Sequence, residues 1–279
     1  MSDTSSLPRS ILVTGAAGRL GSQVARHLGR ALREGRIDRL RLLDIQPVEV
    51  TEEGIEVVQA QLAERTAAYN AAEGMKAIVH LAGIPIEGEW QDLIPANIAA
   101  TAHLFDAAVA HGVDRVLLAS SNHAVGLYPV TQRIDHNARG LADSRYGLTK
   151  LFGEELGRLY AHKTSLRSFC MRIGSCFPTV TAARQLMTYQ SPADFVRLVE
   201  VGLRADYRFE IVYGISDVAD GYWDNDNAFS LGYRPHDTPS DFITGEIDPT
   251  EYHYHGGPVA IDPLPGLKLH ADRSLDAER

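Results

Sequence analysis

The hydrophobic residues of this chain form two kinds of pattern that follow one another regularly. Short continuous apolar runs predict buried strands at 11–14, 39–43, 55–58, 77–81, 115–119 and 168–173. Between them, apolar residues recur every three or four positions, which predicts helices over 19–34, 64–73, 95–111 and 146–162. Strands that alternate with helices at this spacing indicate an α/β fold, a Rossmann-type doubly wound parallel sheet.

Beyond residue 175 the pattern changes. A helix over 193–204 and a seventh strand over 208–213 precede an aromatic, turn-rich stretch. We therefore predict a nucleotide-binding domain over 1–175, a small substrate-capping region over 176–243 and an irregular tail over 244–279. In the tail, His253 and His255 have the spacing of metal ligands, but a solvated tail is the simpler interpretation. We expect Trp223 to pack within the cap.

The first strand leads into three glycines with the spacing G-x-x-G-x-x-G, at Gly15, Gly18 and Gly21. Such a turn lets backbone N–H groups and the following helix N-terminus approach a pyrophosphate. The second strand ends at Asp44, 23 positions after Gly21, where a carboxylate can bind the ribose hydroxyls. A carboxylate repels a 2′-phosphate, so the sequence favours NAD over NADP, although arginines at 36, 39 and 41 could face the same pocket.

Small and polar residues follow several of the predicted strands. Ligands of doubly wound sheets bind at the carboxyl ends of the strands, so these residues should lie at one edge and form the site. They are Gly15, Asp44, Leu81, Ala82, Gly83, the run Ser120–His123, Gly174 and Ser175.

Tyr146 and Lys150 form the candidate catalytic pair. Four residues apart on a helix, they share one face, and Ser121 ends the fifth strand. A phenol is a poor base at neutral pH, but a nearby ammonium and the positive ring of an oxidised nicotinamide would lower its pKa. Ser121 would hold the reacting oxygen beside Tyr146. For His80, within the fourth strand, we expect a hydrogen-bonded core position.

Composition narrows the class further. The net charge is −9, from 27 basic and 36 acidic residues, with no basic run, which argues against nucleic acid or an anionic membrane as partner. Cys170 and Cys176 are expected to be buried and reduced. We find no apolar stretch near the length of a membrane span and no signal peptide, so we expect a cytoplasmic enzyme, in which homo-oligomerisation is possible.

Together these motifs resemble the extended, epimerase-like branch of the short-chain dehydrogenase/reductase superfamily, and more narrowly its uronate dehydrogenases. The resemblance covers about residues 10–243. Its most specific parts are Leu118–His123 followed by Tyr128-Pro129, Tyr146–Lys150, Arg172–Cys176, Arg184 and Gly221–Asn225.

The resemblance implies NAD-dependent oxidation of the C1 hydroxyl of galacturonate or glucuronate to the aldarolactone. Tyr146 would be the base, Lys150 would bind the nicotinamide ribose, and Ser121 would orient the C1 oxygen. Arg184 would pair with the C6 carboxylate, and Asn122, His123 and Ser175 would contact sugar hydroxyls or the carboxylate. The cofactor-binding positions would be Gly15, Gly18, Arg19, Leu20, Gly21, Asp44, Gln61, Leu62, Leu81, Ala82, Gly83, Asn97, Tyr146, Lys150 and Ile173.

Two positions depart from the family pattern. Gln61 stands where an aspartate usually meets the adenine, and Pro85 where a substrate-contacting serine is expected. Other functions stay open: a nucleotide-sugar epimerase or dehydratase would share the tyrosine and lysine, but the 176–243 region is small for its substrate. A non-catalytic NAD-binding protein would need neither residue.

Overall fold

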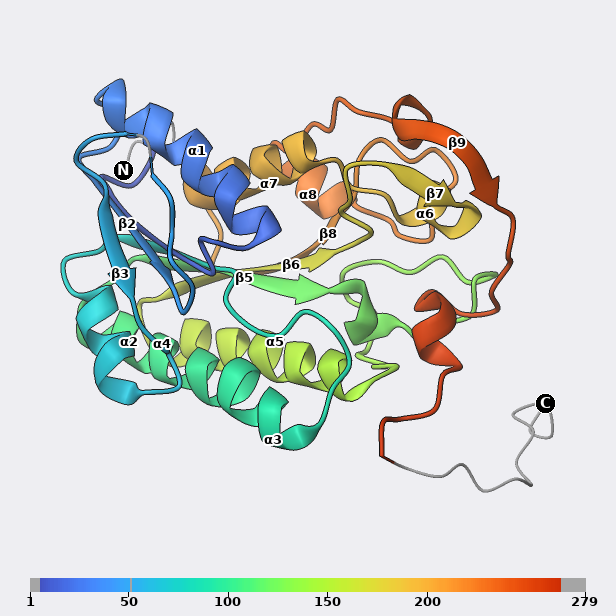
Figure 1. Ribbon diagram of the computed structural model, residues 1–279, viewed down its shortest axis with the longest axis horizontal. Coiled ribbons are helices and arrows are strands. Elements are labelled where there is room, and N and C mark those ends of the chain that lie inside the picture. Colours follow the sequence, from blue (N-terminus) through green and yellow to red (C-terminus); the bar gives the residue numbers. More distant parts are fainter. Residues whose placement is uncertain (1–5, 51, 267–279) are drawn as a thin grey trace.

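A seven-stranded parallel sheet organises the protein, shown in Figure 1 as a computed structural model that describes residues 6–50 and 52–266. The strands lie in the order β3-β2-β1-β4-β5-β6-β8. Their bounds are β1 (Ser10–Thr14), β2 (Arg39–Asp44), β3 (Glu56–Gln59), β4 (Ala77–His80), β5 (Arg115–Ser121), β6 (Arg167–Ile173) and β8 (Phe209–Gly214). The strand order reverses between β1 and β4, which is where doubly wound sheets bind their ligands. The predicted fold and all seven predicted strands of the sheet are confirmed.

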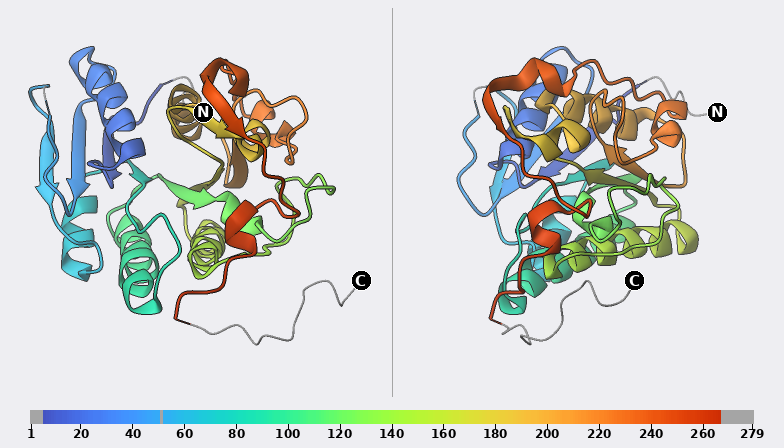
Figure 2. Two further views of the ribbon diagram at one scale, coloured as in Figure 1. Left: turned by 45° about the vertical axis from the view of Figure 1, so that its right-hand side comes forward. Right: turned by 90° about the vertical axis from the view of Figure 1, so that its right-hand side faces the viewer.

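Helices cover both faces of this sheet (Figure 1 and Figure 2). One face carries α1 (Arg19–Arg33) and α7 (Pro192–Arg204), and the other α2 (Arg65–Ala72), α4 (Ala100–Ala110) and α5 (Arg145–Lys163). Because both faces are covered, the inner strands are continuously apolar, and every residue of β1 and β5 is buried. Cys170 and Cys176 are buried free thiols, as predicted.

The predicted helix 95–111 is longer than expected and irregular at its start. It begins with α3 (Trp90–Leu93) and continues through the π-helical turn η1 (Ile94–Ala99) into α4. By length and composition alone this 21-residue helix could cross a membrane, a possibility that the sequence analysis missed. It contacts both α2 and α5 within the protein, and this packing accounts for its apolar composition.

The remaining elements lie near the carboxyl edge of the sheet. A short 3-10 turn, η2 (Asn122–Val125), directly follows β5. A separate two-stranded parallel ladder pairs β7 (Val180–Ala182) with β9 (Ile243–Asp248). The other short elements are α6 (Ala183–Thr188), α8 (Asp226–Ser230), η3 (Pro239–Phe242) and η4 (Gly257–Ala260).

The expectation of an irregular segment from residue 244 onward is wrong in part. β9 is a strand whose residues are nearly all exposed, so it carries no hydrophobic alternation that could have predicted it. Residues 253–257, which we call the C-terminal segment, run along the loop after η2: Val130 N donates to His253 O and His255 N to Tyr128 O. The predicted tail beyond residue 266 lies outside the described residues.

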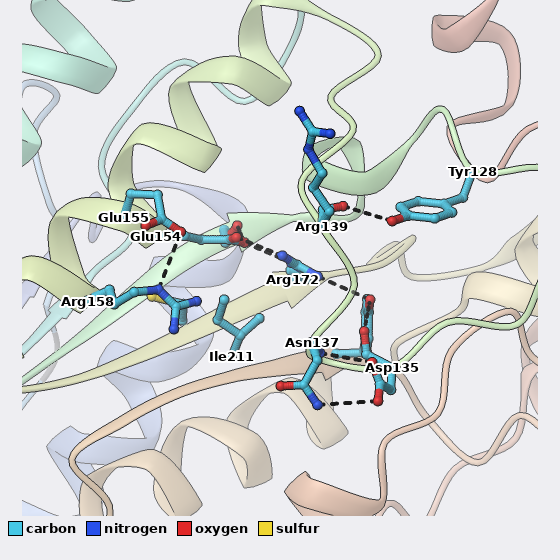
Figure 3. A network of polar contacts seen from close by, with 12 residues as sticks. Tyr128, Asp135, Asn137, Arg139, Glu154, Glu155, Arg158, Arg172 and Ile211 are labelled. Carbon is cyan, nitrogen blue, oxygen red and sulfur yellow. Dashed lines mark hydrogen bonds and ion pairs between the residues drawn. The ribbon is translucent and has the colours of Figure 1, made fainter.

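A buried ion pair between Glu154 and Arg172 connects α5 to β6 (Figure 3). Both Glu154 oxygens accept from Arg172, each at 2.9 Å, and both side chains are 2% exposed. Glu154 also accepts from the hydroxyl of Ser120, and Arg172 donates to Tyr213 Oη at 3.2 Å. The network therefore ties the helix that carries Tyr146 to the strand end that carries Ser121.

Candidate active site

The turn between β1 and α1 has the geometry of a phosphate-binding loop. Gly15 has φ +71°, and a Cβ there would lie 2.6 Å from the nitrogen of Ala82. A Cβ on Gly21 would lie 2.0 Å from Gly15 O, so a side chain is excluded there as well. The turn thus leaves its backbone exposed at the N-terminus of α1, where an anion is favoured.

Asp44 lies beside this loop, as predicted. Its Oδ2 accepts from Ala17 N and its Oδ1 from Gln46 N, both at 2.9 Å. The carboxylate is thereby fixed at the end of β2 and is only partly buried. Of the three arginines that might have faced this pocket, Arg39 and Arg41 instead pair with Glu56, and Arg36 pairs with Glu34.

The loop after β4 is shaped by Asn97 in the π-helical turn. Its Oδ1 accepts from Ile84 N at 2.7 Å, and its Nδ2 donates to Ile84 O and to Thr149 Oγ1, both at 3.0 Å. Gly83, at φ +141°, has no room for a Cβ because Asn97 Oδ1 is 2.9 Å away. Both N–H groups of Asn97 are therefore used within the protein, so it orders the loop on the predicted cofactor side.

His80 is a hydrogen-bonded core residue, as expected. Its ring lies between Thr14 Oγ1 at 2.8 Å and Thr101 Oγ1 at 3.1 Å. Burial lowers its pKa to about 3, helped by the charge of Lys150. The ring is therefore neutral, and it joins the end of β1 to the helix that carries Asn97.

Ser121, Tyr146 and Lys150 meet at the end of β5. Ser121 Oγ accepts from His123 N at 3.2 Å, and its hydroxyl lies near enough to the Tyr146 phenol to act on the phenol's pKa. Lys150 Nζ lies 5.4 Å from the centre of the Tyr146 ring. The structure thus brings together the three residues that sequence spacing selected.

The protein's own groups raise the pKa of Tyr146, whereas the sequence-based expectation was that Lys150 and the nicotinamide ring together lower it. Burial raises it to about 12, and the neighbouring Ser121 hydroxyl only partly offsets this rise. Burial also lowers the pKa of Lys150 to about 8. The expectation counted the charges of the lysine and of the nicotinamide ring but not the cost of burying a phenolate, and that cost dominates among the protein's own groups.

Three of the predicted substrate-binding side chains meet one another beyond the carboxyl ends of β5 and β6. Arg184 Nη1 donates to Ser175 Oγ at 3.4 Å. The surroundings orient the Asn122 amide so that its oxygen accepts from Arg184 Nη2 at 2.8 Å and its nitrogen donates to Ile173 O at 3.1 Å. Because Ile173 pairs with Ser121 in the sheet, this group adjoins the Ser121–Tyr146 pair.

The C-terminal segment completes the surroundings of Arg184. Arg184 Nε donates to His255 O at 2.9 Å, and Nη2 donates to the same oxygen. Burial lowers the pKa of this guanidinium, and among the described residues it forms no ion pair with a carboxylate. The site therefore contains a partly buried cation that forms no ion pair with a described carboxylate.

His255 is not the solvated tail residue that we expected. It is fully buried, stacks on Tyr222 with ring centres 4.6 Å apart, and accepts from Trp223 Nε1 at 3.2 Å. Trp223 stacks on Tyr213 and is 2% exposed, so its predicted packing role is confirmed. Nothing in a Gly-, His- and Tyr-rich sequence indicated that His255 is a core residue. The described residues contain no group of His, Cys, Asp or Glu able to hold a metal.

His123 has a partner that sequence reasoning missed. Its Nδ1 lies 2.8 Å from Oδ2 of Asp143, whose side chain is fully buried. The His123 ring also meets the Tyr146 ring edge to face, with centres 5.9 Å apart. In the sequence, the one indication that Asp143 belongs to the site was its position three residues before Tyr146.

The other predicted cofactor positions lie along the same edge. Arg19 begins α1 and stacks on Phe177, 4.4 Å from the ring centre. Gln61 and Leu62 follow β3, and Leu62 is buried. These placements agree with a dinucleotide that extends across the ends of β3, β2, β1 and β4.

The chain matches the NAD dependent epimerase/dehydratase family over residues 11–186. It is 36% identical to a uronate dehydrogenase of Pseudomonas putida over 260 residues, 90% of this chain and 95% of the relative. It is also 36% identical to an NAD-dependent glucose-6-phosphate dehydrogenase of Haloferax volcanii, covering 88% and 99%.

Among solved structures, a variant of Agrobacterium tumefaciens uronate dehydrogenase complexed with NAD is similar at TM-score 0.84 and 35% identity, covering 92% of this chain and 98% of that chain. The chain therefore belongs to the NAD dependent epimerase/dehydratase family. Within that family, the resemblance to uronate dehydrogenases that the motifs indicated is confirmed.

Proposed function

We propose that this protein oxidises the C1 hydroxyl of a uronic acid, D-galacturonate or D-glucuronate, to the aldarolactone with NAD as acceptor. The observation that carries the substrate is Arg184. A partly buried guanidinium that makes no ion pair with a described carboxylate favours an anion, and its planar fork suits a carboxylate. A neutral hexose would leave that cation partly buried and unpaired, so it should be a poor substrate.

The predicted cofactor site fits NAD by its own geometry. Gly15, Gly18 and Gly21 open the backbone toward a pyrophosphate, since a Cβ at any of the three would lie about 3 Å or less from other backbone atoms. Asp44 offers its carboxylate to the ribose hydroxyls and disfavours the phosphate of NADP. When bound, NAD accepts the hydrogen at C1 together with its electron pair.

Tyr146 removes the proton of the C1 hydroxyl in this proposal. As the O–H bond breaks, its electrons form the C1 carbonyl of the lactone, and the C1 hydrogen leaves with its own electron pair. A phenol with a pKa near 12 stays protonated at neutral pH and cannot accept a proton, so turnover requires additional positive charge close to the ring. Lys150, 5.4 Å from the ring centre, supplies one such charge.

Ser121 and the Arg184 group position the sugar. The hydroxyls of Ser121 and Tyr146 are close neighbours, so a sugar oxygen bound to both would lie at the base. Of the five N–H groups of Arg184, two reach His255 O, one Ser175 and one Asn122, which leaves one on Nη1 for the carboxylate. The Ser175 hydroxyl and the Asn122 amide would complete its binding.

A second candidate substrate is glucose 6-phosphate, because one relative of equal identity is named for it. Both substrate classes carry an anion at C6 and react at C1. A phosphate dianion calls for more donors than the one free N–H of Arg184, which favours the carboxylate.

We place the enzyme in the cytoplasm, where its thiols stay reduced, without nucleic-acid or membrane partners. Homo-oligomerisation stays a prediction.

The test is NADH formation by purified protein with galacturonate, glucuronate, galactose, glucose and glucose 6-phosphate, first with NAD and then with NADP. We expect rapid NAD-dependent turnover of one or both uronates and almost none of the neutral hexoses. Turnover of glucose 6-phosphate alone would overturn the substrate assignment. Absence of turnover with all five would reject the activity and return attention to nucleotide sugars.

A further inference from the structure

The side chain of Asp143 fills a space that two glycines, Gly126 and Gly256, leave open. A Cβ added to Gly126 or to Gly256 would lie 1.8 Å from its Oδ2. Gly126 follows η2 and Gly256 belongs to the C-terminal segment, so two distant parts of the chain each leave space for this carboxylate. The side chain is fully buried, and its negative charge contributes to raising the pKa of Tyr146.

Because this charge disfavours the phenolate form of Tyr146, Asp143 does not assist that residue. Its contacts point to His123. Asp143 N donates to His123 O at 3.3 Å, and the side chains meet through Oδ2 and Nδ1 at 2.8 Å. The other oxygen, Oδ1, accepts from the Ser144 hydroxyl at 2.8 Å, and Ser144 caps α5 by accepting from Gly147 N at 3.0 Å. The carboxylate therefore cannot rotate without losing a bond.

We propose that Asp143 is a positioning residue of the substrate site, which holds the ring proton of His123 on Nδ1 and leaves Nε2 as a hydrogen-bond acceptor. An ionised carboxylate only accepts hydrogen bonds, so the ring atom facing it must donate. In a neutral imidazole the other nitrogen is then an acceptor. In the described part of the chain, Nε2 has no hydrogen-bond partner, and the side chain is 20% exposed.

This assignment divides the recognition of the substrate between two residues. A hydrogen-bond acceptor can bind a sugar hydroxyl but not a carboxylate. His123 would therefore bind a hydroxyl of the sugar, and Arg184 would bind its carboxylate. The division rests on the proposed uronate oxidation, whereas the position of the ring proton does not. The two can therefore fail separately.

The first experiment needs no substrate. Long-range ¹H–¹⁵N correlation spectra of the ¹⁵N-labelled protein at pH 8 report which ring nitrogen carries the proton, and the missing signals of His123→Gln assign His123. We expect the proton on Nδ1. A proton on Nε2, or on both nitrogens, would overturn the proposal whatever the enzyme oxidises.

Asp143→Asn is the matched variant. If the Ser144 hydroxyl keeps the amide oxygen, the amide nitrogen faces Nδ1 and donates to it, which moves the proton to Nε2. We expect that shift in the spectra. We also expect about a tenfold higher KM for the uronate, because Nε2 of His123 would then face the substrate as a donor instead of an acceptor. The KM for NAD should stay the same. Asp92→Asn on α3 is the control and should change neither value.

A double variant with Asp143→Asn and His123→Gln distinguishes a positioning role of Asp143 from a general loss of structure. If Asp143 acts through His123, Asp143→Asn should raise KM little further in a His123→Gln background. An equal rise in both backgrounds, or an unchanged KM in Asp143→Asn with a shifted tautomer, would reject the positioning role. If Asp143→Asn does not fold, the spectrum of the unsubstituted protein still decides the proposal.

Discussion

The guanidinium of Arg184 donates two hydrogen bonds to the carbonyl oxygen of His255, which is 71 residues further along the chain. The next residue but one, Gly257, has φ +66° and passes so close that a Cβ would lie 2.5 Å from Arg184 Cδ. The candidate carboxylate-binding residue is thus held in place by the C-terminal segment.

Gly257→Ala should therefore displace Arg184. We expect about a tenfold increase in KM for the uronate, measured by steady-state NADH formation, with the KM for NAD unchanged. Gly112→Ala is the matched control, since Gly112 has φ +64° and open space where the Cβ would lie. Both variants should lose about 1–2 kcal/mol of stability from the left-handed backbone. An equal KM in the two variants would contradict the contact.

Removing the cation itself should have a larger effect. Arg184→Ala deletes a charged hydrogen-bond donor, a change of about 1.5–3 kcal/mol, or roughly 10- to 150-fold in KM for the uronate. Arg184→Lys keeps the charge without the planar fork. Its KM for the uronate should therefore lie between the values of the unsubstituted protein and of Arg184→Ala. Saturation curves for NAD measured in parallel should not move. An unaltered uronate KM in Arg184→Ala would dismiss the carboxylate role.

Tyr146→Phe removes the proposed base. We expect kcat to fall by about 10²- to 10⁴-fold, because that is the usual contribution of a positioned proton acceptor. Binding of NAD, followed by fluorescence titration, should persist. Tyr160→Phe, on the same helix but bonded to Asp106, is the control and should retain turnover. Substantial activity in Tyr146→Phe would assign the proton transfer to another group.

The ion pair in Figure 3 offers a test of stability. Glu154→Gln would leave the buried Arg172 charge uncompensated, which costs about 3–5 kcal/mol. The neighbouring Glu155 pairs with Arg158 at the surface, so Glu155→Gln should cost less than about 1 kcal/mol. Urea unfolding of both variants measures the difference. Similar losses would show that the buried pair is not required for stability.

His80 should make the protein sensitive to acid. Its pKa is about 3 in the folded state and near 6.5 when unfolded, so the unfolded chain binds the proton first. This contribution to stability is complete above pH 6.5 and is lost as the pH falls toward 3. Between pH 7 and pH 5 the loss is roughly 2 kcal/mol.

Denaturant unfolding at both pH values measures this loss. His80→Gln should reduce the difference in unfolding free energy between pH 7 and pH 5, whereas His111→Gln, at an exposed position, should not. The same pH dependence in His80→Gln and the unsubstituted protein would exclude His80 as the titrating group.

The sheet and the Ser121, Tyr146 and Lys150 group could be predicted from sequence because their signals are local. Buried parallel strands read as continuous apolar runs, and two residues four apart on a helix share a face whatever surrounds them. The alternation of strands and helices indicates a parallel, doubly wound sheet.

The remainder depends on contacts between distant parts of the chain. The environment of Arg184 is provided by the C-terminal segment, and β9 has no buried face that would leave a pattern. Burial, which no spacing reports, raises the pKa of Tyr146 and opposes the charges that were expected to lower it. Asp143 was missed because its partner His123 is 20 residues earlier in the chain.

The order of these parts along the chain has a consequence for synthesis. A domain folds as a unit, and the main sheet is complete once β8 (Phe209–Gly214) has left the ribosome, so the glycine turn, Asp44 and the Tyr146 helix can assemble before residue 255 is available. The guanidinium of Arg184 must wait for His255, which emerges only after another 71 residues. A nascent chain can thus acquire its dinucleotide cleft well before it can distinguish an acidic sugar from a neutral one.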